Sequence, residues 1–168
     1  MKMRTALIPV LVLSLAAASL AIQREVSDAE MVGQSNQIVY GQVVSLTYDY
    51  SNPAWPVMTQ VQVQVENQFK GQPVARTWFT FPGGVKGEMT MEVSDTPELK
   101  VGDEGYFFLY DKAGESLPWL YGWEYGAITI ENGVAHSLSF ATEGASGHEL
   151  PASTIESRLN TLLNGEGH

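Results

Sequence analysis

The segment "TQVQVQVENQF", residues 59–69, decides the fold class, because polar and apolar side chains alternate along it with a period of two. One face of such a strand carries Thr59, Val61, Val63, Val65 and Phe69, and the other carries Gln60, Gln62, Gln64 and Glu66. We expect the first face to be buried and the second to meet water. This is the pattern of an antiparallel sheet, since strands of parallel sheets are apolar throughout.

Further strands are expected on both sides of this segment, separated by turns rich in glycine and proline. They cover residues 38–46 ("IVYGQVVSL"), 74–81, 89–93, 106–111 ("YFFLYD"), 127–130 and 134–139. Gly41 indicates a bulge or a close backbone approach within its strand. "YFFLYD" is apolar on both faces, which predicts a central strand. Asn132-Gly133 predicts a tight hairpin, because both residue types tolerate a positive φ.

Helices are expected only at the two ends. Ser27 and Glu30 have capping-box spacing and predict a helix through about Gln34. Ser153 and Glu156 repeat this spacing ahead of an apolar stripe formed by Ile155, Leu159, Leu162 and Leu163, and Gly165 should end that helix. The predicted fold is mainly β: a small antiparallel, OB-like β-barrel or a sandwich, with a short N-terminal helix and a C-terminal amphipathic helix.

The first 21 residues are typical of a secretory signal peptide. Lys2 and Arg4 precede an apolar run, and Ser19-Leu20-Ala21 resembles a cleavage site. We therefore expect residues 22–168 to form one exported domain with a core barrel at about 38–140, periplasmic or extracellular and without a membrane anchor once residues 1–21 are removed.

Charge and cysteine content exclude several classes of protein. The chain has a formal charge of −10, which becomes −12 once Lys2 and Arg4 are removed. This acidity opposes binding to nucleic acid, which requires clustered basic residues. The absence of cysteine excludes disulfide scaffolds, iron–sulfur clusters, thiol nucleophiles and cysteine zinc sites.

A resemblance to a known family covers about residues 38–130. The succession "IVYGQVVS", "TQVQVQVENQFKG", "FTFPGGV", "LKVGDEGYFFLY" and "GWEYGAITI" resembles an uncharacterised small β-barrel domain of secreted bacterial proteins. That domain occurs alone or ahead of a predicted metalloprotease domain. Its "G-x-V … F-K-G" core is distantly similar to the OB-fold-like netrin-type modules, which include metalloproteinase inhibitors. The resemblance implies a fold and a compartment, because its residues are turn glycines and core hydrophobes.

Two family features are missing from this chain. Netrin-type inhibitors dock on metalloproteases through an N-terminal cysteine, and the metalloprotease domains carry a zinc-binding "HExxH" motif; this sequence has neither. An effect on proteolysis would therefore have to come from binding a separate partner protein.

No catalytic motif stands out, and we expect no cofactor. The three histidines His136, His148 and His168 lack the i,i+4 spacing of a helical zinc site. Ser146 near His148 does not complete a G-x-S-x-G elbow, and Gly83-Gly84 is not followed by P-loop residues. Paired carboxylates and a calcium site both stay open, with candidates at Asp95, Glu98, Asp103, Glu104, Asp111 and Glu124.

The remaining candidate surface is the aromatic segment "PWLYGWEYG", residues 118–126, together with Trp55 in the loop "SNPAWPV". A regular strand would place Trp119, Tyr121, Trp123 and Tyr125 on one face. These rings could fill the core, contact a partner protein or stack on a glycan. The resembling family has glycines at the positions of Gly122 and Gly126, and this resemblance implies a bend that would break up the row.

Three functions follow from these observations. The first is a secreted, non-enzymatic binding or accessory module that contacts an extracellular or periplasmic protein such as a protease. The second is a carbohydrate-binding module that uses the aromatic residues at 119–125. The third is a small hydrolase with paired carboxylates.

Overall fold

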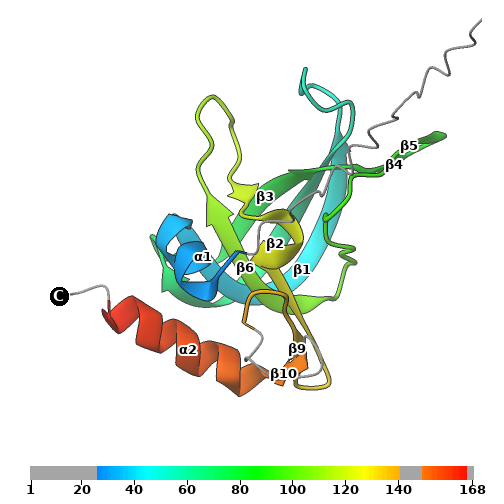
Figure 1. The fold of residues 1–168 in the computed structure, drawn as a ribbon. Coiled ribbons are helices and arrows are strands. Elements are labelled where there is room, and N and C mark those ends of the chain that lie inside the picture. Colours follow the sequence, from blue (N-terminus) through cyan, green and yellow to red (C-terminus); the bar gives the residue numbers. More distant parts are fainter. Residues whose placement is uncertain (1–25, 141–148, 166–168) are drawn as a thin grey trace, which may run out of the picture.

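The computed structural model describes residues 26–140 and 149–165. It confirms the predicted mainly β fold, with a large mixed sheet, a ring of five strands and one short helix toward each end (Figure 1). The expected signal peptide, residues 1–21, lies outside the described residues. No helix in the described ranges is long and apolar enough to cross a membrane.

Five strands close the ring: β1 (Gln37–Asp49), β2 (Met58–Lys70), β3 (Arg76–Pro82), β7 (Trp119–Leu120) and β6 (Glu104–Tyr110). They are hydrogen-bonded in the order β1-β2-β3-β7-β6, and β6 pairs with β1 to complete the circle. The β3–β7 pair is parallel and the other four are antiparallel. This order, with its single parallel pair, is that of an OB-type barrel.

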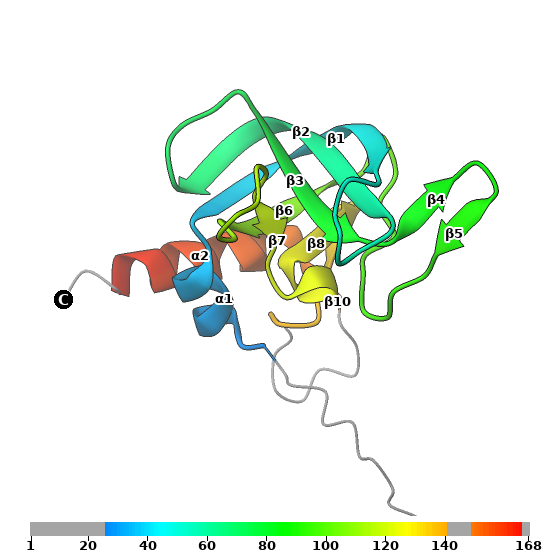
Figure 2. The ribbon, with the colours of Figure 1, turned by 90° about the horizontal axis from the view of Figure 1, so that it is seen from above.

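Three more strands extend the sheet beyond β6: β8 (Ala127–Glu131), β9 (Val134–His136) and β10 (Glu149–Pro151). Asn132 and Gly133 have positive φ angles of 51° and 80°, which confirms the predicted hairpin between β8 and β9. A separate hairpin, β4 (Gly84–Lys86) and β5 (Met89–Met91), replaces the single strand expected at 89–93. It projects from the barrel on the side opposite the helices (Figure 2).

The core has two parts, one on each side of β6. Phe107 and Leu109 point into the barrel interior, where they join Val61, Val63 and Phe79. The alternate β6 residues Tyr106 and Phe108 point outward and pack under the helices with residues such as Ile38, Met31 and Leu159. The prediction that residues 106–111 form a central strand is confirmed, because β6 pairs with β1, β7 and β8.

The β1–β2 pairing contains three register shifts, and they change the face that some β2 side chains occupy. Val61 and Val63 are fully buried in the barrel, as the alternation predicts. Phe69 does not share their face: it lies opposite a shift between Ile38 and Val39 and packs against the outer part of the core. The prediction for Phe69 was wrong because a bulge inserts an extra residue and resets the alternation.

Gly41 occupies a second bulge, as predicted. The register shifts between Tyr40 and Gly41. A Cβ atom at position 41 would lie 2.1 Å from the carbonyl oxygen of Gln64 in β2. Only glycine allows the two strands to approach this closely.

The two helices are α1 (Asp28–Gln34) and α2 (Ala152–Gly165). The Ser27 hydroxyl accepts a hydrogen bond from the Glu30 N–H at 3.2 Å and caps α1 as expected. Helix α2 begins one residue before Ser153, so the capping role predicted for Ser153 was wrong. Ile155 and Leu159 of the predicted stripe are fully buried.

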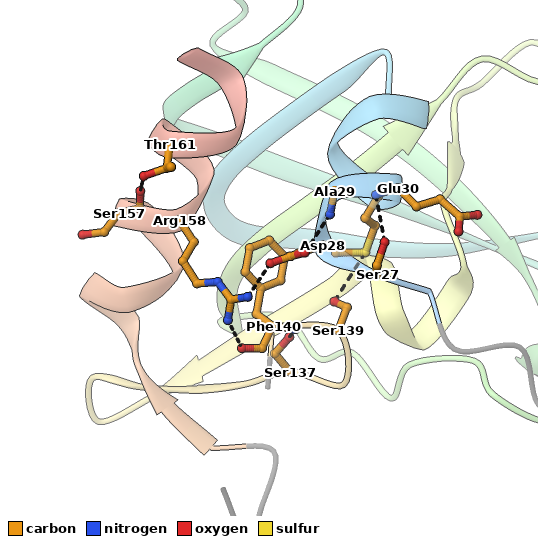
Figure 3. A network of polar contacts seen from close by, with 11 residues as sticks. Ser27, Asp28, Ala29, Glu30, Ser137, Ser139, Phe140, Ser157, Arg158 and Thr161 are labelled. Atoms are coloured by element: carbon orange, nitrogen blue, oxygen red, sulfur yellow. Dashed lines mark hydrogen bonds and ion pairs between the residues drawn. The ribbon is translucent and has the colours of Figure 1, made fainter. Parts of the chain in front are cut away.

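Arg158 joins the two helices to the loop that follows β9 (Figure 3). One guanidinium nitrogen donates to Asp28 Oδ2 at 2.6 Å and another to the Phe140 carbonyl at 2.8 Å. The guanidinium carbon also lies 5.6 Å from the centre of the Phe140 ring. One side chain therefore holds α2 against α1 and the barrel.

Replacing Arg158 should loosen this attachment. We expect Arg158→Met to lower the free energy of unfolding by about 1–3 kcal/mol, because it removes two charge-assisted hydrogen bonds and keeps most of the apolar stem. Arg158→Lys, which keeps the charge but cannot hold both acceptors, should lose less. Urea denaturation measures both, and a methionine variant as stable as the parent protein would contradict this role.

Candidate functional site

The aromatic segment does not form a row of four rings. Strand β7 ends at Leu120, and the chain then turns through Gly122 at φ 59° and Trp123 at φ 53° into a 3₁₀ turn, η1 (Trp123–Gly126). The bend predicted at Gly122 is confirmed. The bend removes the two-residue period on which a flat platform would depend.

The five predicted aromatic residues lie in three separate places. Trp119 is buried at 2% exposure, and the Lys112 ammonium lies 3.4 Å from the centre of its ring. Trp55 meets Trp123 edge-on, with an angle of 87° between the ring planes and 6.1 Å between the ring centres. Tyr121 and Tyr125 instead pack against the helix side of the core, where the Tyr121 hydroxyl donates to Glu30 Oε1 at 3.0 Å. These rings do not present the coplanar exposed pair that sugar stacking favours.

A cleft that the sequence did not indicate lies between the barrel and the start of α2. Its volume is about 660 Å³. We call it the tyrosine–glutamate cleft, because its lining includes three rings and three carboxylates, those of Tyr40, Phe69, Tyr106, Glu66, Glu104 and Glu156. The other lining residues are small, polar or aliphatic. β1, β2, β6 and α2 each contribute at least one of the six residues.

The three rings are brought together by strand pairing. Tyr40 of β1 lies directly opposite Tyr106 of β6, and their ring centres are 5.0 Å apart with the planes inclined at 44°. The bulge in β2 brings Phe69 to the same side, with its ring centre 5.7 Å from that of Tyr106 at 51°. Tyr106 is only 4% exposed, so the central ring of the three is held in place by packing.

The three cleft glutamates have no basic partner among the described residues. The ion pairs found there are Arg158–Asp28 and His136–Glu149. Lys70, at the end of β2, donates to the carbonyls of Val32 and Gly33 at the end of α1. The lining of the cleft itself contains no lysine, arginine or histidine. Negative charge therefore gathers around the rings without an internal counter-charge.

Burial and the nearby carboxylates raise the pKa of Tyr40 and of Tyr106. Burial raises the pKa of Tyr106 to about 12, with smaller contributions from Glu156 and Tyr40. The pKa of Tyr40 is raised by burial, then by the charges of Glu104 and Glu66. Both phenols are therefore neutral at physiological pH, and the Tyr40 hydroxyl donates to Glu104 Oε2 at 3.3 Å.

The Tyr106 hydroxyl belongs to a side chain that is more than nine-tenths buried and lines the cleft. Within the part of the chain that the structure describes, no hydrogen-bond partner is found for it. An unpaired hydroxyl at the wall of a cleft is available to a ligand or to water.

The residues tested for chemistry do not converge. Within residues 26–140 and 149–165, no group of three histidine or carboxylate side chains could hold a metal ion. His148, His168 and Ser146 lie outside these ranges. Of the candidate acids, Asp103 accepts the Lys100 N–H in its own turn, and Glu104 alone lines the cleft.

Sequence reasoning missed the cleft because its residues are far apart along the chain. Tyr40 and Tyr106 occupy outward positions of their strands, but nothing local shows that β1 and β6 pair. Glu104 was a candidate only for a carboxylate pair or a calcium site, and nothing local places it beside the two tyrosines. No protein-family model, curated protein or solved structure matches this chain significantly.

The raised pKa gives a direct test of the cleft's electrostatics. In isotope-labelled protein, the Tyr106 ring should titrate near pH 12 by NMR, and Glu156→Gln should lower that pKa while leaving it above 10.0, since burial is the larger cause. Because the folded-state pKa exceeds the ordinary value, this tyrosine should cost no stability below pH 10 and should destabilise the fold progressively above it. Glu88→Gln, on the opposite hairpin, is the control, and an equal effect from it would contradict the assignment.

Proposed function

We propose that this protein is an exported, non-enzymatic binding module that receives a cationic group of an extracellular or periplasmic protein in the tyrosine–glutamate cleft. One observation carries the proposal. Three carboxylates line the cleft, and no basic side chain of the lining neutralises them. A positively charged group of a partner protein would supply the missing counter-charge.

The geometry also favours a protein partner. The cleft is open to solvent and is lined by four strands and the first turns of α2, so a side chain could enter it while its backbone stays outside. Glu66 and Glu156 are exposed and can attract a cation from a distance, whereas Glu104 is oriented by Tyr40 deeper in the wall. The acidity of the whole chain supports the same choice of partner.

Calorimetry with synthetic peptides tests this function. We expect a lysine-rich peptide to bind and a glutamate-rich peptide of equal length not to bind. The variant Glu66→Gln/Glu104→Gln/Glu156→Gln should weaken binding about tenfold, since partly exposed charge pairs contribute about 0.2–1 kcal/mol each. Added salt should weaken binding by the parent protein more than binding by this variant.

A matched variant separates the cleft from the general acidity of the protein. Glu88→Gln/Glu92→Gln/Glu115→Gln removes the same charge from exposed positions outside the cleft. It should bind the lysine-rich peptide nearly as well as the parent. Equal weakening in both triple variants would mean that the cleft has no special role. If the cleft variant alone loses binding, crosslinking in the secreted proteome, with the cleft variant as the negative control, would identify the partner.

A further inference from the structure

We propose that the free edge of β1 is a docking site for an extended segment of a partner protein, which adds to the sheet as one more strand. The site consists of residues 44–49, the second half of β1, and the groove beside them. The groove borders the β4–β5 hairpin, on the side of the barrel opposite the helices (Figure 2). It shares no lining residue with the tyrosine–glutamate cleft, so this proposal does not rest on the function proposed above.

Only the first half of β1 has a strand on each side. Its pairing with β6 stops at Gln42, and the last hydrogen bonds on that edge join Val43 to Gly102 and Asp103. From Ser45 to Asp49 the strand pairs with β2 alone. Among the described residues, no other strand pairs with this edge. The edge therefore presents main-chain donors and acceptors that a further strand can pair with.

The side chains show which residues carry these free groups. Along a strand, the side-chain face and the hydrogen-bonding edge alternate together, so residues that point into the barrel present their N–H and C=O groups to one edge. Val43 points inward and bonds on the β6 side. Leu46 packs against the same core, and Tyr48 follows two residues later. Leu46 and Tyr48 therefore present their main-chain groups to the free edge.

This half-strand lacks the prolines and charges that usually keep an edge from pairing. Its sequence, "VSLTYD", contains no proline or lysine, and its only charged residue, Asp49, stands at the end. Its valine, threonine and tyrosine favour extended backbone. Addition of a peptide strand to such an edge is a common mode of protein recognition, in which backbone hydrogen bonds provide the affinity.

The groove determines the side-chain pattern of the added strand. Its volume is about 700 Å³, and part of its lining is continuous with the barrel core: Phe81 belongs to that core, and Leu46 and Leu99 pack against it. Tyr48 and Val85 also line the groove and are 37% and 50% exposed. Because the side chains of a strand alternate between its two faces, every second residue of the partner segment should be apolar.

The charge of the groove selects a neutral or basic segment. Its lining includes Glu92 and Glu98, and among the described residues it contains no lysine, arginine or histidine. A second copy of this chain, with a formal charge of −10, would bring like charges together at the edge. A segment with lysine or arginine at its ends would instead be attracted.

A short acetylated peptide, in which valine and threonine alternate between terminal lysines, tests the site. In the free protein, the amides of Leu46 and Tyr48 should exchange hydrogen faster than those of Val39 and Gly41, which face β6. Addition of the peptide should protect Leu46 and Tyr48. Failure of the peptide to bind, or full protection of both amides before it is added, would overturn the proposal.

N-methylation of the peptide distinguishes backbone pairing from side-chain contact. Methyl groups on alternate amides block one edge of the peptide and leave its side chains unchanged. Of the two forms, methylated at odd or at even positions, one should bind about tenfold more weakly or worse, because several backbone hydrogen bonds are lost. The other should bind like the unmodified peptide. Equal affinities of the two forms would contradict edge pairing.

A matched pair of variants locates the peptide on the protein. Val85→Lys removes an apolar contact and adds a repelling charge to the lining, and it should weaken binding about 3- to 10-fold. Val74→Lys makes the same change at a position that is 40% exposed and lies outside the groove, and it should bind like the parent.

Two further results separate this site from its alternatives. The cleft variant Glu66→Gln/Glu104→Gln/Glu156→Gln should bind the strand peptide like the parent protein; loss of binding there would place the peptide in the cleft and sink the edge site, whereas a failure of the lysine-rich peptide alone leaves it standing. Analytical ultracentrifugation should find no dimer that Val85→Lys abolishes. Such a dimer would make a second copy of the chain the occupant and would refute the proposed partner.

Discussion

The pairing of β1 with β6 is the constraint on which the rest of the structure depends. Residues 38–42 of β1 are paired with β2 along one edge and with β6 along the other, so this half-strand closes the ring. Its inward side chain Val39 faces the barrel interior, and its outward side chains Ile38 and Tyr40 face the helices. One stretch of backbone thus defines both the barrel core and the wall of the cleft.

Closing a ring of five strands requires β1 and β2 to bend strongly, and the bulges supply that bend. Gly41 allows the closest approach, at the point where the register shifts. The same shifts leave Glu66 and Phe69 as extra residues on β2, and both line the tyrosine–glutamate cleft. The cleft is therefore a by-product of closure, since the deformation that completes the barrel also redirects two of its lining side chains.

Local patterns in the sequence were sufficient for much of the fold. The alternation at Val61 and Val63, the two-sided character of residues 106–111, and the turn at Asn132-Gly133 each depend on near neighbours, and each prediction is confirmed. Phe69 shows where such reasoning fails, because a bulge depends on the partner strand and leaves no trace in the period of its own strand. The aromatic segment shows the same limit: its spacing suggested one face, but β7 ends before Tyr121.

The candidate site was harder to predict than the fold, because it depends on pairings between distant segments. Tyr40 and Tyr106 are 66 positions apart and meet only through the register of β1 and β6, and Glu156 arrives on a helix held in place by Arg158. Once they meet, burial and negative charge both raise the pKa of the two tyrosines and keep the phenols protonated. The lining of the cleft contains no basic side chain that could act as a counter-ion for the glutamates. A neutral aromatic wall inside a negative field is unfavourable for an anion and favourable for a cation, so the features that protect the tyrosines from ionising also support the cationic partner that we propose.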